Sequence, residues 1–188
     1  MYRISLIRAM KKTLIVGLVV ISVVFISCKK DVAELPAATQ TGANTFGCKI
    51  DGNFWVPAGF GIVPTAPVLE ARIAGNELYI NARNFSSSPT ESEFEIYIKN
   101  LDTTGNYTLS TGASHPDYSN NYAYYVHRKF TPDNEWVTTS PYTGTVTITK
   151  IDPVNHFVSG TFEFRAINLY NTPQPVNITE GRFDVKTQ

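Results

Sequence analysis

The chain has 188 residues with equal numbers of basic and acidic side chains, 16 of each, so its formal net charge at pH 7 is zero. This balance offers no basic surface of the kind that phosphate backbones require, and we expect no nucleic-acid partner. The length suits one domain with a substantial core, and a total of two cysteines excludes a small disulfide-linked scaffold.

Residues 1–27 have the order of an export signal. Basic residues near the start precede an apolar run of about 13 residues, Leu14–Ile26, which is followed by Ser27 and Cys28. The run is too short for a transmembrane helix, which needs roughly 20 residues. An ordinary secretory signal would account for the run, but it would leave a cysteine directly after a small residue unexplained.

This arrangement resembles the bacterial lipobox, in which the cysteine is acylated and the chain is cut before it. The resemblance implies that residues 1–27 are a lipoprotein signal peptide and that Cys28 is the lipid attachment site. The membrane is then a partner through acyl chains, and two or more chains hold a protein stably. Met10 would also serve as the start of the signal, without any change to the mature protein.

We expect a cell-envelope protein, lipid-anchored in the outer membrane. Lys29–Asp31 follow the anchor directly, and a lysine-then-acid cluster at this place resembles the surface-display signal of Bacteroidetes lipoproteins. Residues 28–44 contain no aromatic side chain and show neither helical nor strand periodicity. We therefore predict the lipidated cysteine and a flexible tether over 28–44, followed by a single β-domain over 45–188.

From Thr45 onward the chain consists of short alternating runs separated by Gly, Pro, Asn and Asp. Apolar side chains alternate with polar ones, as in an antiparallel sheet with one face in water. The clearest runs are 46–50, 78–83, 94–99, 145–149, 162–165 and 183–185. They predict an all-β fold, an antiparallel β-sandwich of about ten strands, with a lipocalin-like barrel as the alternative. Cys48 lies on an apolar face, and we expect a small buried hydrophobic side chain rather than a nucleophile.

Four segments in this order resemble an uncharacterised family of Bacteroidetes lipoproteins, a domain of unknown function. They are Phe46 with Ile50-Asp51-Gly52 and Trp55; Gly105–Leu109; Gly144–Thr149; and Val158–Phe164 with Ile178–Phe183. The resemblance covers nearly all of Thr45–Gln188. It implies an exported β-domain, and it carries no assigned activity, so no functional residue is transferred from it.

One segment is rich in aromatic residues, Tyr118–Arg128, and a tryptophan follows shortly after it. The candidate ligand-binding residues are Tyr122, Tyr124, Tyr125 and Trp136, because such rings suit sugars or protein partners. Tyrosine also fills half-buried strand positions, so packing is the competing interpretation. On a regular strand, Tyr122 and Tyr124 share one face and Tyr125 takes the other, so all four cannot line one site.

Chemical motifs are otherwise scarce. The sequence lacks the common nucleophile, zinc and phosphate-loop motifs, and His115, His127 and His156 share no ligand spacing. We expect no catalytic residue, no metal site and no cofactor. Glu91, Glu93 and Glu95 share one strand face, which we expect to be solvated. Thr103 lies in Asp-Thr-Thr, a triplet similar to the O-glycosylation motif of Bacteroidetes, and is a weak candidate for modification.

These observations favour a lipid-anchored envelope lipoprotein that acts, without catalysis, as a ligand- or partner-binding module. A glycan or an envelope protein is the expected partner. The alternatives are a structural or assembly component of an envelope complex and, third, a hydrolytic enzyme.

Overall fold

The computed structural model describes residues 34–59, 67–86, 91–110, 114–128, 134–170 and 174–188. They belong to one compact unit, Val32–Gln188, so a fragment that covers this unit retains the whole described core. The expected signal peptide and Cys28 lie outside the described residues. In the described part, no helix is long and apolar enough to span a membrane.

All regular structure among the described residues is strand. The eleven strands are β1 (Thr45–Ile50), β2 (Asn53–Trp55), β3 (Leu69–Ala74), β4 (Glu77–Asn84), β5 (Ser92–Ile98), β6 (Gly105–Leu109), β7 (Tyr122–His127), β8 (Glu135–Val137), β9 (Gly144–Asp152), β10 (Phe157–Asn168) and β11 (Val176–Lys186). The prediction of an all-β fold is confirmed, with one strand more than expected.

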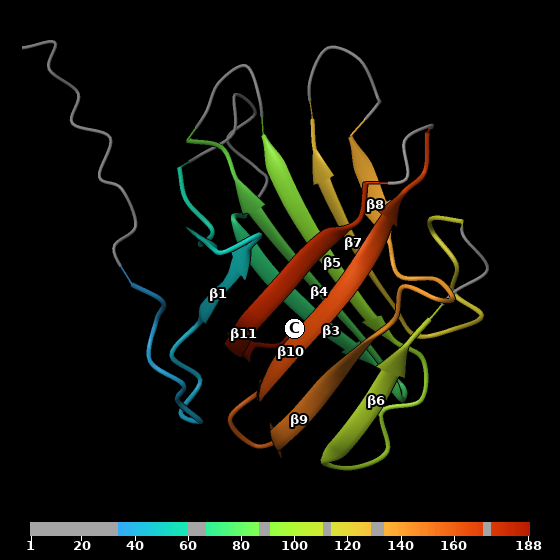
Figure 1. The fold of residues 1–188 in the computed structure, drawn as a ribbon. Helices are drawn as coiled ribbons and strands as arrows, with labels where there is room; N and C mark the ends of the chain where they lie inside the picture. Colours follow the sequence, from blue (N-terminus) through green and yellow to red (C-terminus); the bar gives the residue numbers. More distant parts are fainter. Residues whose placement is uncertain (1–33, 60–66, 87–90, 111–113, 129–133, 171–173) are drawn as a thin grey trace, which may run out of the picture. The chain divides into compact units, whose positions relative to one another are not determined.

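The strands form one antiparallel sheet that curls into a half-barrel (Figure 1). Its order is β2-β1-β11-β10-β8-β7-β5-β4-β3, and β9 and β6 extend it beside β10. β10 joins the two halves: it pairs with β9 and β11 along most of its length, and its last residues, Ile167 and Asn168, pair with β8. The half that contains β11 therefore faces the half that contains β5, as in a sandwich whose layers share a strand.

The core between the two halves is aromatic, as the alternation predicts. Along β10, Phe162 and Phe164 are buried, whereas the residues between and beside them are exposed. Phe162 meets Phe46 of β1 with ring centroids 5.0 Å apart, and Phe94 of β5 meets Trp55 at 4.6 Å. Each such ring contributes roughly 1.5–3 kcal/mol by burial. Cys48 is fully buried among them, and burial raises the pKa of its thiol, which agrees with a packing role.

The residues before β1 are not a free tether. Residues 39–44, which we call the strap, wrap around the buried carboxylate of Asp184 in β11. Thr39 Oγ1 donates to this carboxylate at 2.6 Å, and the backbone N–H groups of residues 41–43 donate to it at 2.9–3.0 Å. The Ser159 hydroxyl donates from the other side at 2.7 Å.

The prediction of a flexible tether is therefore wrong for the strap, and the ordered domain begins before Thr45. The physical reason is that one carboxylate satisfies several backbone donors that would otherwise need water. Burial alone would raise the pKa of Asp184, but the hydrogen bonds from Thr39 and from the strap amides hold it well below its usual value. Residues 28–33 of the expected tether lie outside the described residues.

Candidate functional site

The two ends of the curled sheet approach each other at a seam between β1–β2 and β3. Beyond β2 the chain bonds to the end of β4: Ala58 N–H donates to the Arg83 carbonyl at 3.2 Å, and Phe85 N–H donates to the Ala58 carbonyl at 2.9 Å. Further along, Ala71 of β3 forms a parallel bridge with Thr187, which follows β11. These contacts tie the seam at two places.

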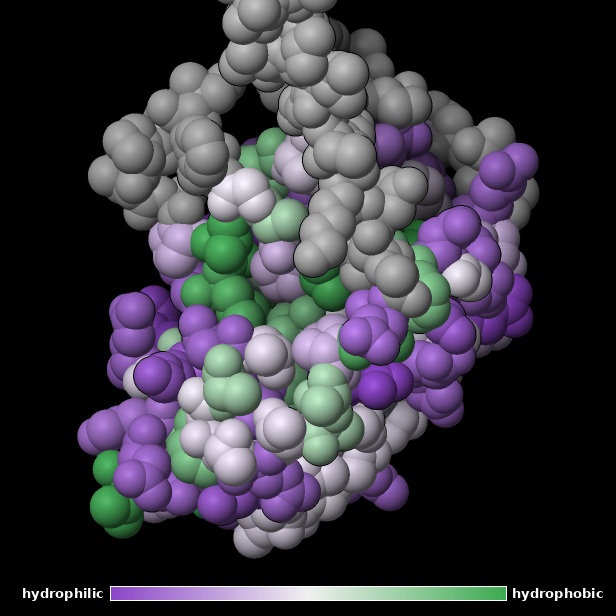
Figure 2. Space-filling model, turned by 90° about the vertical axis from the view of Figure 1, so that its left-hand side faces the viewer, coloured by the Kyte–Doolittle hydropathy of each residue, from purple (hydrophilic) through white to green (hydrophobic). Residues whose placement is uncertain are grey.

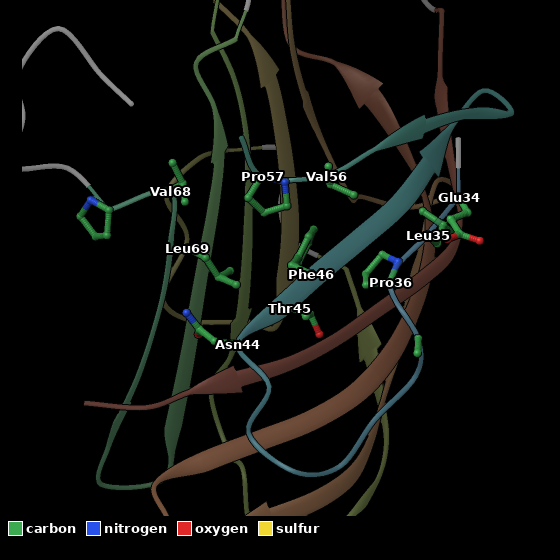
Figure 3. Close-up of a pocket in the computed structure, with 12 residues that line it drawn as sticks. Glu34, Leu35, Pro36, Asn44, Thr45, Phe46, Val56, Pro57, Val68 and Leu69 are labelled. Atoms are coloured by element: carbon green, nitrogen blue, oxygen red, sulfur yellow. The ribbon is translucent and has the colours of Figure 1, made fainter. Parts of the chain in front are cut away.

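Between the β1 and β3 ends, the seam opens into a groove of about 750 Å³, which we call the seam groove (Figure 3). Its lining comes from the N-terminal segment, β1, the residues after β2, and the start of β3: Glu34, Leu35, Pro36, Ala37, Asn44, Thr45, Phe46, Val56, Pro57, Pro67, Val68 and Leu69. Nine of these twelve side chains are apolar. The volume lies within the usual range for small-molecule sites, roughly 300–1,000 Å³.

The walls of the seam groove come from segments far apart in the sequence. Figure 3 shows Val68 and Leu69 on one side, Leu35 and Pro36 on the other, and Phe46 between them. Phe46 is 2% exposed, and the other four are half-buried. The face that carries the N-terminal segment shows hydrophobic side chains gathered in its upper half and bordered by hydrophilic ones (Figure 2).

Gly47 explains how the N-terminal segment lies across β1. A Cβ atom at this position would lie 2.7 Å from Pro36 Cδ and 3.2 Å from Val56 Cγ1, closer than ordinary contacts. Glycine therefore allows Pro36 to pack directly on the strand and to form one wall of the groove.

The seam groove is almost uncharged. Among the described residues that line it, Glu34 is the only charged one, and it is exposed. Asn44 is partly committed elsewhere, because its side-chain carbonyl accepts a hydrogen bond from the backbone N–H of Lys186 at 3.3 Å. The lining offers apolar contact rather than an array of hydrogen bonds, which favours an apolar occupant.

A second cluster lies on the outer face of the other half of the sheet, around Glu95 of β5. Tyr122 donates to one carboxylate oxygen, and Tyr79 donates to the other at 3.0 Å. His115 Nε2 lies 3.3 Å from the first oxygen, and its ring stacks on Tyr124 with centroids 3.5 Å apart. Glu95 is 8% exposed, so the expectation of a solvated strand face is wrong for it, because tyrosines and His115 cover the carboxylate.

The electrostatics of this cluster point to a structural role. Burial alone would raise the pKa of Glu95, but His115 beside the carboxylate and the hydrogen bond from Tyr122 lower it below its usual value. Burial, together with the nearby carboxylate, raises the pKa of Tyr122 and of Tyr79. The carboxylate is therefore charged and the phenols are neutral near pH 7, and none is poised to exchange protons there.

Ion pairs continue the cluster across four strands. Glu93 of β5 accepts from Arg83 of β4 at 3.2 Å and from Arg128, just after β7, at 2.8 Å. Arg83 also pairs with Glu70 of β3, and Arg128 with Glu91. Each of these carboxylates has a cationic partner, so the network ties strands together. Among the described residues, no group of three His, Cys, Asp or Glu side chains is placed to hold a metal ion.

Comparison with known proteins identifies a family and no close relative. The sequence model of a family described as a domain of unknown function, DUF6252, matches residues 42–185. The chain belongs to this family. No curated protein and no solved structure shows a significant match. The DUF6252 range includes Asp184 and the end of the strap, whereas the groove wall at Leu35 and Pro36 precedes it.

Within the DUF6252 domain, the predicted aromatic residues do not form one exposed surface. Tyr122 and Tyr124 are buried in the outer cluster, whereas Tyr125 is buried in the main core and stacks on half-buried Trp136 at 5.4 Å. The predicted alternation is confirmed. Rings that already pack against each other offer little face to a sugar, because stacking requires an accessible ring.

The remaining predicted residues do not form one site. Thr103 is exposed before β6 and is accessible for modification. His115 lies over β7, His127 ends that strand, and His156 is exposed in the turn between β9 and β10. The three histidines therefore belong to separate elements. Cys28 lies outside the described residues.

Sequence reasoning missed both the seam groove and Asp184. A weak signal existed for the groove, because Pro36, Pro57 and Pro67 mark segments that cannot extend a sheet. For Asp184 the signal was a single acid within an alternating apolar strand, which requires a hydrogen-bonded partner when buried.

Proposed function

We propose that this chain is a lipid-anchored protein of the cell envelope, of the kind found in Bacteroidetes, whose DUF6252 domain binds a ligand or partner without catalysis. The anchor is Cys28, acylated after removal of residues 1–27, and the membrane is the outer membrane. The observation that carries the binding role is the seam groove, a largely apolar hollow of about 750 Å³. A well-formed apolar pocket is the default binding site of a domain without an assigned one.

The chemistry of the seam groove and of the cluster around Glu95 supports binding over catalysis. The described residues that line the seam groove include no histidine, cysteine, serine or lysine, and the carboxylate of Glu34 is exposed to water. Around Glu95, the carboxylate accepts hydrogen bonds from two tyrosines and lies beside His115, so the cluster stabilises the sheet.

The anchor is tested by metabolic labelling with an alkyne fatty acid in a bacterial host. We expect the full chain to be labelled and to fractionate with the outer membrane, and Cys28→Ser to lose the label. Cys48→Ala is the matched control, because Cys48 is buried and should not affect labelling. An unlabelled wild-type chain, or a labelled Cys28→Ser chain, would contradict the anchor.

The binding role is tested on the fragment Lys29–Gln188 by thermal unfolding with a panel of apolar ligands, glycans and metal ions. A ligand that binds only the folded state adds about 2.7 kcal/mol of stability at a hundred times its Kd. We expect shifts with apolar compounds. The absence of a shift throughout the panel would contradict a small-ligand site and direct attention to a protein partner.

A further inference from the structure

The seam groove is lined in part by the segment that leads to the proposed lipid anchor. Glu34, at one end of its lining, is six residues after Cys28. Six extended residues span at most about 20–22 Å. If Cys28 is acylated, which is the proposed function on which this inference rests, the groove therefore remains within roughly this distance of the membrane surface.

The strap fixes this relationship. Its backbone N–H groups at residues 41–43 are bound to Asp184, and the Gln40 carbonyl accepts from Lys150 Nζ at 3.3 Å. The hydrogen bonds of the strap therefore resist a force that acts on the anchor. Along the chain, Leu35 and Pro36 come between the anchor and the strap, so this wall of the groove belongs to the segment that connects the two.

The lining suits a hydrocarbon chain better than the other candidate ligands. A glycan exchanges many hydroxyl–water hydrogen bonds for protein ones, and among the described lining residues only Glu34, Asn44 and Thr45 have polar side chains to supply them. An acyl chain needs only apolar contacts, and the nine apolar residues of the lining provide them.

We propose that the seam groove binds a single fatty-acyl chain of a lipid from the membrane to which the protein is anchored. The chain lies between Leu35–Pro36 and Val68–Leu69, over Phe46. The headgroup remains outside, next to Glu34, where water and polar side chains are available.

The test uses the fragment Lys29–Gln188 without detergent and cis-parinaric acid, a fluorescent fatty acid, as the probe. We expect saturable binding of one molecule per chain. Val68→Gln puts an amide in the wall and should weaken binding about tenfold or more, since burying an unpaired amide costs at least about 1–3 kcal/mol. Ile73→Gln is the matched control: Ile73 lies in β3, which begins directly after Val68, and it is also half-buried, but it does not line the groove, so the variant should leave the Kd unchanged.

Absence of saturable binding, or equal weakening by Val68→Gln and Ile73→Gln, would overturn the proposal. Circular dichroism of both variants confirms that they are folded. These outcomes are independent of the anchor, because the fragment lacks Cys28. Failure of Cys28 labelling in the full chain would refute the anchor, but it would not change the affinity measured with the fragment.

A second arm identifies the source of the acyl chain. The full acylated chain is reconstituted into vesicles that contain a photoactivatable phosphatidylethanolamine with a diazirine in its acyl chain. We expect crosslinks in the peptide that contains Pro67–Leu69. If the fragment binds the probe but no crosslink forms there, the proposal that a separate membrane lipid occupies the groove is overturned.

Discussion

Gly181 of β11 lies directly opposite Phe162 of β10, and the missing side chain makes room for the aromatic ring. A Cβ atom at Gly181 would lie 2.5 Å from the ring and from the carbonyl oxygen of Phe162. The same arrangement recurs where Gly160 faces Phe183, whereas a Cβ atom at Gly144 would meet the Cβ atom and backbone of Phe164 rather than its ring. Large rings on the inner face of this half of the sheet are thus accommodated by glycines on the neighbouring strand.

Gly181→Ala is therefore expected to destabilise the domain by about 1–3 kcal/mol through overpacking. The clash involves backbone as well as ring atoms, so a rotamer change cannot remove it. Urea unfolding of the fragment Lys29–Gln188 measures the effect. Thr179→Ala is the control, because Thr179 is exposed on the same strand, and it should stay within about 0.5 kcal/mol. Equal stability of both variants would contradict the packing argument.

Asp184→Asn is expected to loosen the strap and to destabilise the fold by about 2 kcal/mol or more. An amide removes the charge that strengthens these hydrogen bonds and leaves buried N–H groups without an acceptor. Hydrogen exchange should accelerate at residues 41–43, which bond directly to the carboxylate. Asp51→Asn is the control, because this exposed turn residue also accepts a backbone hydrogen bond, from Asn177, but lies in the β1–β2 turn rather than at the strap. Unchanged exchange at 41–43 would refute the role of Asp184.

Asp184 also predicts how stability changes with pH. Its pKa in the folded state is well below its ordinary value of 3.8. A carboxyl whose pKa is lowered by folding contributes stability above its unfolded pKa and loses that contribution as the pH falls. The free energy of unfolding should therefore decrease from about pH 5 to pH 3. Urea unfolding at several pH values should show a shallower decrease for Asp184→Asn, and equal slopes would contradict the assignment.

Alternation predicts which side chains of a strand face the core and which face outward. It does not predict the contacts around Glu95 or around Asp184. The pattern placed Tyr122 and Tyr124 on one face and Tyr125 on the other, and the structure confirms it. It could not show that Glu95 is buried, because His115 reaches it from a segment 20 residues away in sequence. Asp184 is a stronger case, since its strap donors lie more than 140 residues earlier.

The seam groove shows the same limit. Local sequence predicts the strands, but where the two ends of a curled sheet meet depends on the twist and pairing of all the strands between them. Leu35 and Leu69 belong to segments that local patterning treats separately, and only the closed topology brings them to one hollow.

Tyr122→Phe tests the outer cluster. The variant keeps the ring but removes a hydrogen bond to a buried carboxylate, and we expect a loss of about 1.5–3 kcal/mol in the free energy of unfolding. It should also raise the pKa of Glu95, because one of the bonds that lower it is gone. Carboxyl NMR titration measures this shift. Tyr118→Phe is the control, since Tyr118 is 57% exposed and makes ring contacts in the same cluster. A stable variant with an unchanged Glu95 titration would refute the role of this bond.

Gly47→Ala tests the wall of the seam groove. Gly47 does not have a positive φ, so its backbone conformation suits alanine. Where there is free space, such a substitution stabilises a protein by about 0.4–1 kcal/mol, because it lowers the conformational entropy of the unfolded chain. Here the new Cβ meets Pro36 at 2.7 Å, and we expect destabilisation and faster hydrogen exchange in residues 34–38 instead.

Pro36→Ala separates the two contributions, because it removes the ring atoms that the new Cβ would meet. In the double variant, Gly47→Ala should cost less than it does alone, and a double-mutant cycle measures the difference. Additive effects would mean that Pro36 does not pack on β1, and the groove would then lack the wall on its N-terminal side. A non-additive cycle, together with weaker cis-parinaric acid binding in Gly47→Ala alone, would tie the geometry of this contact to the binding site.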